Sequence, residues 1–100
     1  MGFTISHSEP ASRSALTIEN LGHHLEDSLT ASDWRVVQRL FDRRYISYTS
    51  IGPQAAGEIA AVLRRAIASR RMPTDWAALA TTFARAAQRA ADAREPWVWR

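Results

Sequence analysis

The sequence contains no cysteine and no lysine, and it has only four glycines and four prolines among 100 residues. The absence of cysteine excludes disulfides, thiolate metal sites and cysteine nucleophiles. No segment approaches the roughly 20 apolar residues of a membrane span, so we expect no contact with a membrane. The opening MGFTISHSEP lacks the basic start and apolar stretch of a secretory signal, and we therefore expect a cytoplasmic protein.

All thirteen basic residues are arginine, and with ten acidic residues they give a formal net charge of +3. The sequence pI of about 10.5 overstates this basic character, because the guanidinium group has a very high pKa. The charge is uneven: residues 1–52 carry five arginines and six acids, whereas residues 53–100 carry eight arginines and four acids. The exclusive use of arginine, together with abundant alanine, is also typical of a GC-rich genome.

Hydrophobic spacing predicts two short strands and four helices. Phe3–Ser6 alternates apolar and polar residues, and residues 45–51 (YISYTSI) are rich in aromatic and β-branched types, as in strands. The predicted helices cover about 15–29, begin at 32 and at 53, and cover about 74–93. Their inward stripes are Ile18, Leu21, Leu25 and Leu29; Trp34, Val37 and Phe41, widened by Val36 and Leu40; Ile59, Leu63, Ala66 and Ile67; and Trp76, Leu79, Ala80, Phe83 and Ala87.

The pattern of one half recurs in the other at an offset of 42 residues, where Ser32-Asp33-Trp34 meets Thr74-Asp75-Trp76 and Phe41 meets Phe83. We predict one domain over residues 1–100 with halves 1–44 and 45–94 and a tail at 95–100. The fold class is α+β and mostly α, with β-α-α-β-α-α order and an internal pseudo-two-fold duplication that pairs the two strands.

The repeated Asp-Trp has two interpretations. The aspartates could be paired general acid and base groups beside stacking indoles. Alternatively, Ser32 and Thr74 are N-caps, each Asp favours the positive end of a helix, and each Trp begins a buried stripe. We adopt the second interpretation, because it explains every residue of the motif.

Other chemical motifs are weak. His23 and His24 are adjacent and therefore about 100° apart on a helix, which leaves His24 with Asp27 as the one plausible ligand pair in HHLED. No G-x-S-x-G, S-x-x-K or glycine-rich phosphate loop occurs. We expect no metal, no cofactor, no catalytic residue and no enzymatic activity.

Arginines gather in the second half. Arg64, Arg65, Arg70 and Arg71 cluster near the end of the third predicted helix, and Arg85 and Arg89 share one face of the fourth. These side chains are candidates for phosphate contacts with nucleic acid. Local pairing argues against this, because Asp92 follows Arg89 by three residues and Asp42 follows Arg39 by three. No recognised DNA- or RNA-binding motif is present.

The tail EPWVWR places both indoles on one side of an extended segment. Either it folds back over the helices and buries Trp97 and Trp99, or it anchors a partner. The leading hypothesis is a non-enzymatic protein–protein interaction or regulatory module. Its partner-binding residues would be Trp97, Trp99, Arg85, Arg89 and Arg94, its partner is unidentified, and a homodimer stays open. The alternative is nucleic-acid binding by the arginine-rich second half.

The segment RRMPTDWAALA, together with the terminal PWVW, resembles a set of short, uncharacterised single-domain proteins found mostly in actinobacteria. The resemblance spans nearly the whole chain and implies a single-domain family and an actinobacterial source. It implies no activity and no functional residues.

Overall fold

A computed structural model shows four helices and four short strands in the residues that it describes, which are 2–9, 12–42 and 48–100. The elements are β1 (Gly2–Thr4), β2 (Ser12–Ser14), α1 (Ala15–Ser28), α2 (Ala31–Phe41), β3 (Thr49–Ile51), α3 (Pro53–Ile67), α4 (Thr74–Ala93) and β4 (Trp97–Trp99). The mostly α, α+β class and the predicted order are confirmed, with β2 and β4 as additions. Within the described ranges, no helix has the length and apolar character to cross a membrane.

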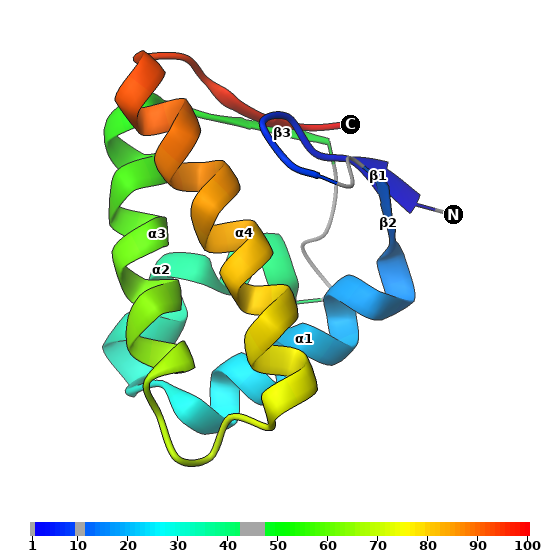
Figure 1. Cartoon of the computed structure of the whole chain (residues 1–100), viewed down its shortest axis with the longest axis vertical. Helices are drawn as coiled ribbons and strands as arrows, with labels where there is room; N and C mark the ends of the chain where they lie inside the picture. Colours follow the sequence, from blue (N-terminus) through cyan, green and yellow to red (C-terminus); the bar gives the residue numbers. More distant parts are fainter. Residues whose placement is uncertain (1, 10–11, 43–47) are drawn as a thin grey trace.

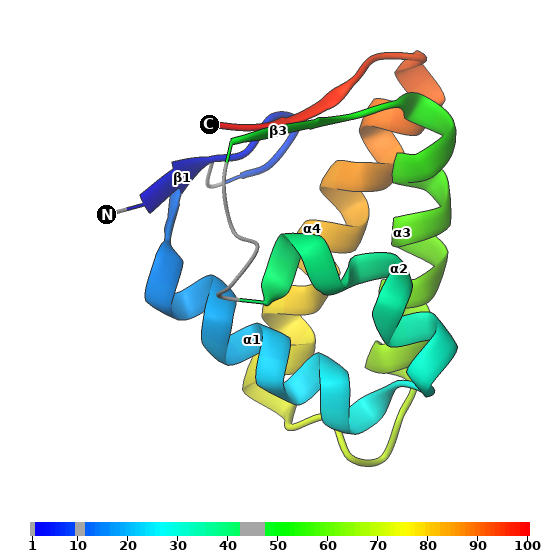
Figure 2. The same cartoon turned by 180° about the vertical axis from the view of Figure 1, so that it is seen from behind.

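Helices α3 and α4 form an antiparallel pair along one side of the molecule (Figure 1). Alanine is abundant where they are buried, and small side chains allow helix axes to approach closely. Helices α1 and α2 lie across the other side of this pair (Figure 2). The buried alanines of α3 and α4 are Ala56, Ala60, Ala66, Ala80, Ala84, Ala86, Ala87 and Ala90.

The four strands form two two-stranded sheets, one of β1 and β2 and one of β3 and β4. Strands β1 and β2 pair antiparallel, as do β3 and β4. An antiparallel bridge between Ile5 and Trp99 joins the two pairs. Thr4 and Arg100 exchange backbone hydrogen bonds of 2.7 and 2.8 Å beside that bridge.

This pairing corrects the expectation that the first strand pairs with the strand predicted at 45–51. The C-terminal segment lies between them, because β4 pairs with β3 on one side and contacts the β1 segment on the other. Ser12–Ser14, for which no strand was predicted, pairs with β1. Of the predicted second strand, Thr49–Ile51 is confirmed, and residues 45–47 lie outside the described residues.

Trp97 and Trp99 are core residues, which contradicts their prediction as partner-binding side chains. Their exposed fractions are 0% and 1%. Trp99 packs against Phe41 and Phe83 with ring centroids 5.5 and 5.4 Å apart, and Trp97 lies 5.4 Å from Trp99. The physical reason is the hydrophobic effect: each indole carries a large apolar surface, and removing that surface from water in the core stabilises the fold. The folded-back alternative for the tail is therefore the one observed.

Both predicted helix caps are wrong by one or two residues. Thr30, not Ser32, caps α2, and its hydroxyl accepts a hydrogen bond from the Asp33 amide at 3.2 Å. Pro73, not Thr74, is the N-cap of α4, with no side-chain cap. Proline fixes the extended backbone that a cap requires, so Thr74 becomes the first helical residue.

The predicted stripes are buried or half-buried apart from Val36, which is exposed at 39%, whereas Leu40 belongs to the core at 1%. The half-buried members are Leu29, Ile67, Trp76 and Leu79. Gly22 lies where α1 meets the end of α2: a Cβ built there would lie 2.3 Å from the Phe41 carbonyl oxygen. This glycine is required for the close approach of the two helices.

Candidate functional site

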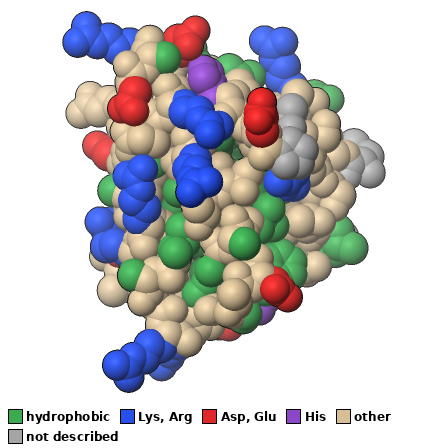
Figure 3. All heavy atoms as spheres, viewed as in Figure 1, with side chains coloured by type: hydrophobic (Ala, Val, Ile, Leu, Met, Phe, Trp, Pro, Cys, Tyr) green, Lys and Arg blue, Asp and Glu red, His purple; other side chains and the backbone are tan. Residues whose placement is uncertain are grey.

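Five exposed arginines form what we call the arginine surface: Arg64 on α3, Arg70 and Arg71 in the α3–α4 connection, and Arg85 and Arg89 on α4. The space-filling view of the α3–α4 side shows basic side chains at both ends of the molecule and across its middle, with acidic side chains interspersed (Figure 3). The Arg64–Gln88 hydrogen bond and the i, i+4 spacing of Arg85 and Arg89 place these three arginines together on the α3–α4 side, and Arg70 and Arg71 lie in the connection between the two helices. One predicted candidate is an exception.

The exception is Arg65. Its guanidinium donates two hydrogen bonds to the Asp33 carboxylate, from Nε to Oδ2 at 2.9 Å and from Nη2 to Oδ1 at 3.0 Å. These bonds hold the pKa of Asp33 below its usual range and raise the pKa of Arg65. Because this ion pair compensates the charge of Arg65, we leave Arg65 out of the arginine surface, and its phosphate contact stays a prediction.

Two of the other arginines donate to uncharged acceptors. Arg64 donates from Nη1 to Gln88 Oε1 at 3.0 Å, and Arg89 donates from Nη1 to the His7 carbonyl at 3.0 Å. Both acceptors are neutral. The expected pairing of Arg89 with Asp92 does not occur, since Asp92 accepts a hydrogen bond from Gln88 at 2.8 Å. In the part of the chain that the structure describes, no member of the arginine surface forms an ion pair.

Arg94 is the C-cap residue of α4. It ends α4 in the left-handed conformation, with φ 58°, and its amide donates to the Ala91 carbonyl. The following Glu95 amide returns to the Ala90 carbonyl at 2.9 Å, so the two residues close the helix. The Arg94 side chain is exposed at the point where the chain turns into β4.

Ser6, His7 and Glu95 form a polar cluster that sequence reasoning missed. His7 Nδ1 lies 2.9 Å from Ser6 Oγ, and His7 Nε2 lies 3.2 Å from Glu95 Oε1. A serine–histidine–carboxylate series suggests a nucleophile. Here, however, Ser6 Oγ accepts the Val98 amide at 2.8 Å, and the Ser6 carbonyl accepts Trp97 Nε1 at 3.0 Å. The cluster thus fastens β4 to the N-terminal segment and leaves the hydroxyl oxygen engaged.

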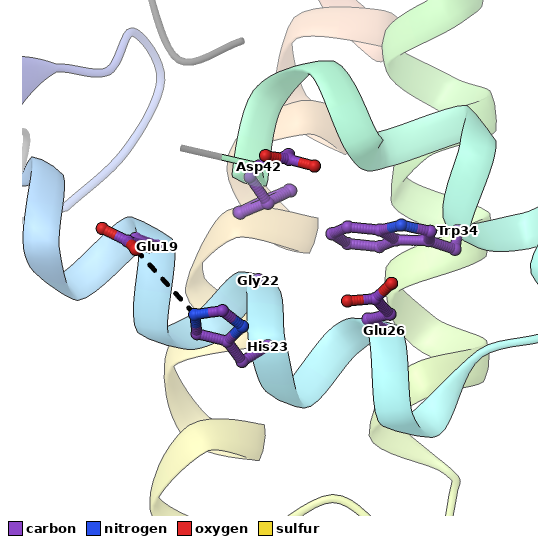
Figure 4. A pocket seen from close by; sticks show the side chains of 7 residues that line it. Glu19, Gly22, His23, Glu26, Trp34 and Asp42 are labelled. Atoms are coloured by element: carbon purple, nitrogen blue, oxygen red, sulfur yellow. Dashed lines mark ion pairs between the residues drawn. The ribbon is translucent and has the colours of Figure 1, made fainter. Parts of the chain in front are cut away.

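A hollow of about 230 Å³ lies between α1 and α2 (Figure 4). The indole of Trp34 lies between the side chains of Glu26 and Asp42, and Glu19 makes a 3.9 Å ion pair with His23. Its lining is Glu19, Gly22, His23, Glu26, Trp34, Phe41 and Asp42. The hollow is acidic, in contrast to the α3–α4 side.

The candidate metal pair is not assembled into a site. The His24 ring stacks on Trp76 with centroids 4.9 Å apart, which ties α1 to the start of α4. Over residues 2–9, 12–42 and 48–100, no group of three or more potential metal ligands occurs. The histidine therefore has a packing role in the described structure.

The fold and the site define a small, mostly helical domain that has two short antiparallel sheets and carries exposed arginines on α3, α4 and their connection. The chain belongs to the family described as "Domain of unknown function (DUF7739)", which matches residues 7–100. This agrees with the single-domain family that the terminal motifs implied. No curated protein and no solved structure matches the chain.

Proposed function

We propose that the protein is a cytoplasmic, non-enzymatic module that binds the phosphate backbone of nucleic acid on the arginine surface. One observation carries the proposal: among the described residues, no carboxylate forms an ion pair with the guanidinium groups of Arg64, Arg70, Arg71, Arg85 and Arg89. Phosphate oxygens satisfy such groups with forked, charge-assisted hydrogen bonds. The local pair of Arg89 with Asp92, which argued against this function from the sequence, is not formed among the described residues.

The extent of the surface suits a long polyanion. Helix α4 has 20 residues and is therefore about 30 Å long, close to the 31 Å longest dimension of the molecule. Arg70 and Arg71 precede its start, and Arg89 lies one turn before its end. A duplex rises 3.4 Å per base pair, so this length corresponds to about nine base pairs.

Several observations favour nucleic acid over a protein partner. Protein interfaces depend on buried aromatic anchors, and the tail no longer offers Trp97 and Trp99. Among the described residues, the exposed large hydrophobic side chains are Leu16, Val36 and Tyr48, and none lies on α3 or α4. Phosphate contacts need no such anchor. An acidic protein surface is the competing ligand that the experiment must separate.

The test is a titration of the protein with a labelled duplex of about 20 base pairs at two salt concentrations. Each phosphate contact contributes a slope of about −0.9 to the dependence of log affinity on log salt. If all five arginines make contact, affinity falls by roughly 500-fold between about 50 and 200 mM salt. Absence of a complex at the lower salt concentration would show that the proposal is wrong.

A charge-matched pair of variants separates the surface from net charge. Arg85→Ala with Arg89→Ala should weaken binding and reduce the salt slope by about 2. Arg35→Ala with Arg39→Ala removes the same charge from exposed positions on α2 and should change binding much less. Equal losses would refute the assigned surface. Poly-L-glutamate bound as tightly as the duplex would instead identify an acidic protein as the ligand class.

A further inference from the structure

Gln88 is the amide side chain between the two arginines of α4, and both of its ends are engaged. Its Oε1 accepts from Arg64 Nη1 at 3.0 Å, and its Nε2 donates to Asp92 Oδ1 at 2.8 Å. The chemistry fixes this orientation, because guanidinium only donates and a carboxylate only accepts. The amide therefore cannot rotate without losing both hydrogen bonds.

A side-chain amide that recognises a base by a bidentate contact uses both its oxygen and its nitrogen. Glutamine recognises adenine by accepting from N6 and donating to N7 in the same contact. In Gln88 the oxygen and the nitrogen of the amide are both already hydrogen-bonded within the protein. The other side chains beside the arginines on this side of α4 are small: Ala78, Thr81 and Thr82, and each threonine hydroxyl donates to a backbone carbonyl of its own helix.

We infer that the arginine surface binds nucleic acid without reading its sequence, and that Gln88 is a positioning residue that orients Arg64 toward phosphate. This inference rests on the proposed function and names the part of the ligand that is recognised. Gln88 holds the guanidinium of the exposed Arg64 by one of its five donors, so four N–H groups remain for phosphate oxygens. The bond to a neutral oxygen orients the side chain and leaves its charge intact.

Arg89 is also held by a hydrogen bond to a neutral oxygen, which here belongs to the N-terminal segment. Its acceptor is the carbonyl of His7, whose position is fixed by the contacts of the His7 ring with Ser6 and Glu95. No hydrogen bond holds the guanidinium groups of Arg70, Arg71 and Arg85 within the described chain. Ordering a free side chain on binding costs conformational entropy, so Arg64 and Arg89, which are already held, are the two anchors of the surface.

The first experiment compares single alanine variants in the duplex titration. Arg64→Ala and Arg89→Ala should each weaken binding by about tenfold, and Arg85→Ala by about threefold, at about 50 mM salt. Each of the three should reduce the salt slope by about 1, since each removes one contact. Equal losses for all three variants would overturn the assignment of anchors while leaving phosphate binding itself in place.

The second experiment isolates Gln88. Gln88→Ala should weaken binding by about threefold with an unchanged salt slope, because the Arg64 contact persists but must be ordered on binding. Asp92→Asn retains an oxygen that accepts from Gln88 and removes a negative charge, so it should strengthen binding by two- to threefold. A purely structural role for either residue would change thermal unfolding and leave affinity unaltered.

Sequence independence is measured with duplexes of equal length and different composition. Wild type should bind an A·T-rich duplex, a G·C-rich duplex and a mixed one within about twofold of each other, since phosphate contacts carry no sequence information. A preference of tenfold or more that Gln88→Ala abolishes would show that Gln88 reads a base and would overturn the inference. Failure of wild type to bind any duplex would count against the proposed function instead.

Discussion

Asp33 and Arg65 are joined by two hydrogen bonds, of 2.9 and 3.0 Å, that tie the first turn of α2 to the last turn of α3. The side-chain exposed fractions of 56% for the arginine and 23% for the aspartate place the pair at the protein surface. Such a forked pair has the planar geometry in which arginine binds carboxylates best. It links the two halves of the sequence at a point where the repeated motif is not symmetric, because Asp75 remains exposed.

The pair should make stability depend on pH in the acid range. The pKa of Asp33 is lowered by its hydrogen bonds to Arg65, so the folded state holds the ionised form more tightly than the unfolded chain does. The contribution is complete above the unfolded value of about 3.9 and is lost as pH falls through the lower folded value. Denaturant unfolding of wild type and Asp33→Asn should therefore differ at pH 7 and converge near pH 2.5. A constant difference at both pH values would contradict this.

Two helical glycines should respond oppositely to alanine. Gly22→Ala places a Cβ 2.3 Å from the Phe41 carbonyl oxygen and 3.0 Å from its carbon, so α1 and α2 must separate. We expect a loss of about 1–3 kcal/mol in the free energy of unfolding. Gly57→Ala is the control, because its nearest neighbour is Ala91 Cβ at 3.6 Å. It should gain about 0.5–1 kcal/mol from helix propensity, as measured by urea titration.

Arg94→Gly should stabilise the protein. Arg94 has φ 58°, which a residue with a Cβ adopts at a cost of roughly 1 kcal/mol and glycine adopts freely. The unfolding temperature should rise by about 4–8 °C per kcal/mol in a domain of this size. Arg94→Ala removes the same charge but keeps a Cβ at the left-handed position, so the unfolding temperature of this variant should not rise. If the alanine variant is stabilised equally, the side chain rather than the backbone is responsible.

Truncation after Ala93 should abolish cooperative unfolding. It removes Trp97 and Trp99, and large-to-small changes at buried aromatic positions cost about 3–5 kcal/mol each, against a total stability of about 5–15 kcal/mol. Circular dichroism should show partial helix and no sharp thermal transition. Trp76→Ala, at a half-buried position, is the control and should leave a cooperative transition at a lower temperature. Cooperative unfolding of the truncated chain would show that the core does not require Trp97 and Trp99.

The helices could be predicted from the sequence because their signals are local. The three- and four-residue spacing of Ile18, Leu21 and Leu25 identifies the buried face of α1 without reference to any partner. Strand pairing could not, since the contact of Ile5 with Trp99 depends on residues at opposite ends of the chain. The Thr30 cap was missed because Thr30, Ser32 and Asp33 are all acceptable caps, and the backbone alone decides among them.

The candidate site was predictable in part. Composition and helical spacing indicated the residues of the arginine surface, and all five of them are exposed. Which arginines are compensated depends on contacts between helices, and neither the Arg65–Asp33 pair nor the Arg64–Gln88 bond has a sequence signal. The role of His7 was also invisible, because its ring and its carbonyl act on residues more than 80 positions away.

The bridge between Ile5 and Trp99 also governs the order in which the chain folds. Joining two points 94 residues apart costs about 4 kcal/mol of loop-closure entropy, whereas α3 and α4 are joined by a short connection. We therefore expect the α3–α4 hairpin to form early and the margin of strands to close last. Refolding should then be slower than in helical domains of equal length whose contacts are local. On the ribosome the core stays incomplete until Trp99 has emerged, so the nascent chain exposes apolar surface to chaperones up to that point.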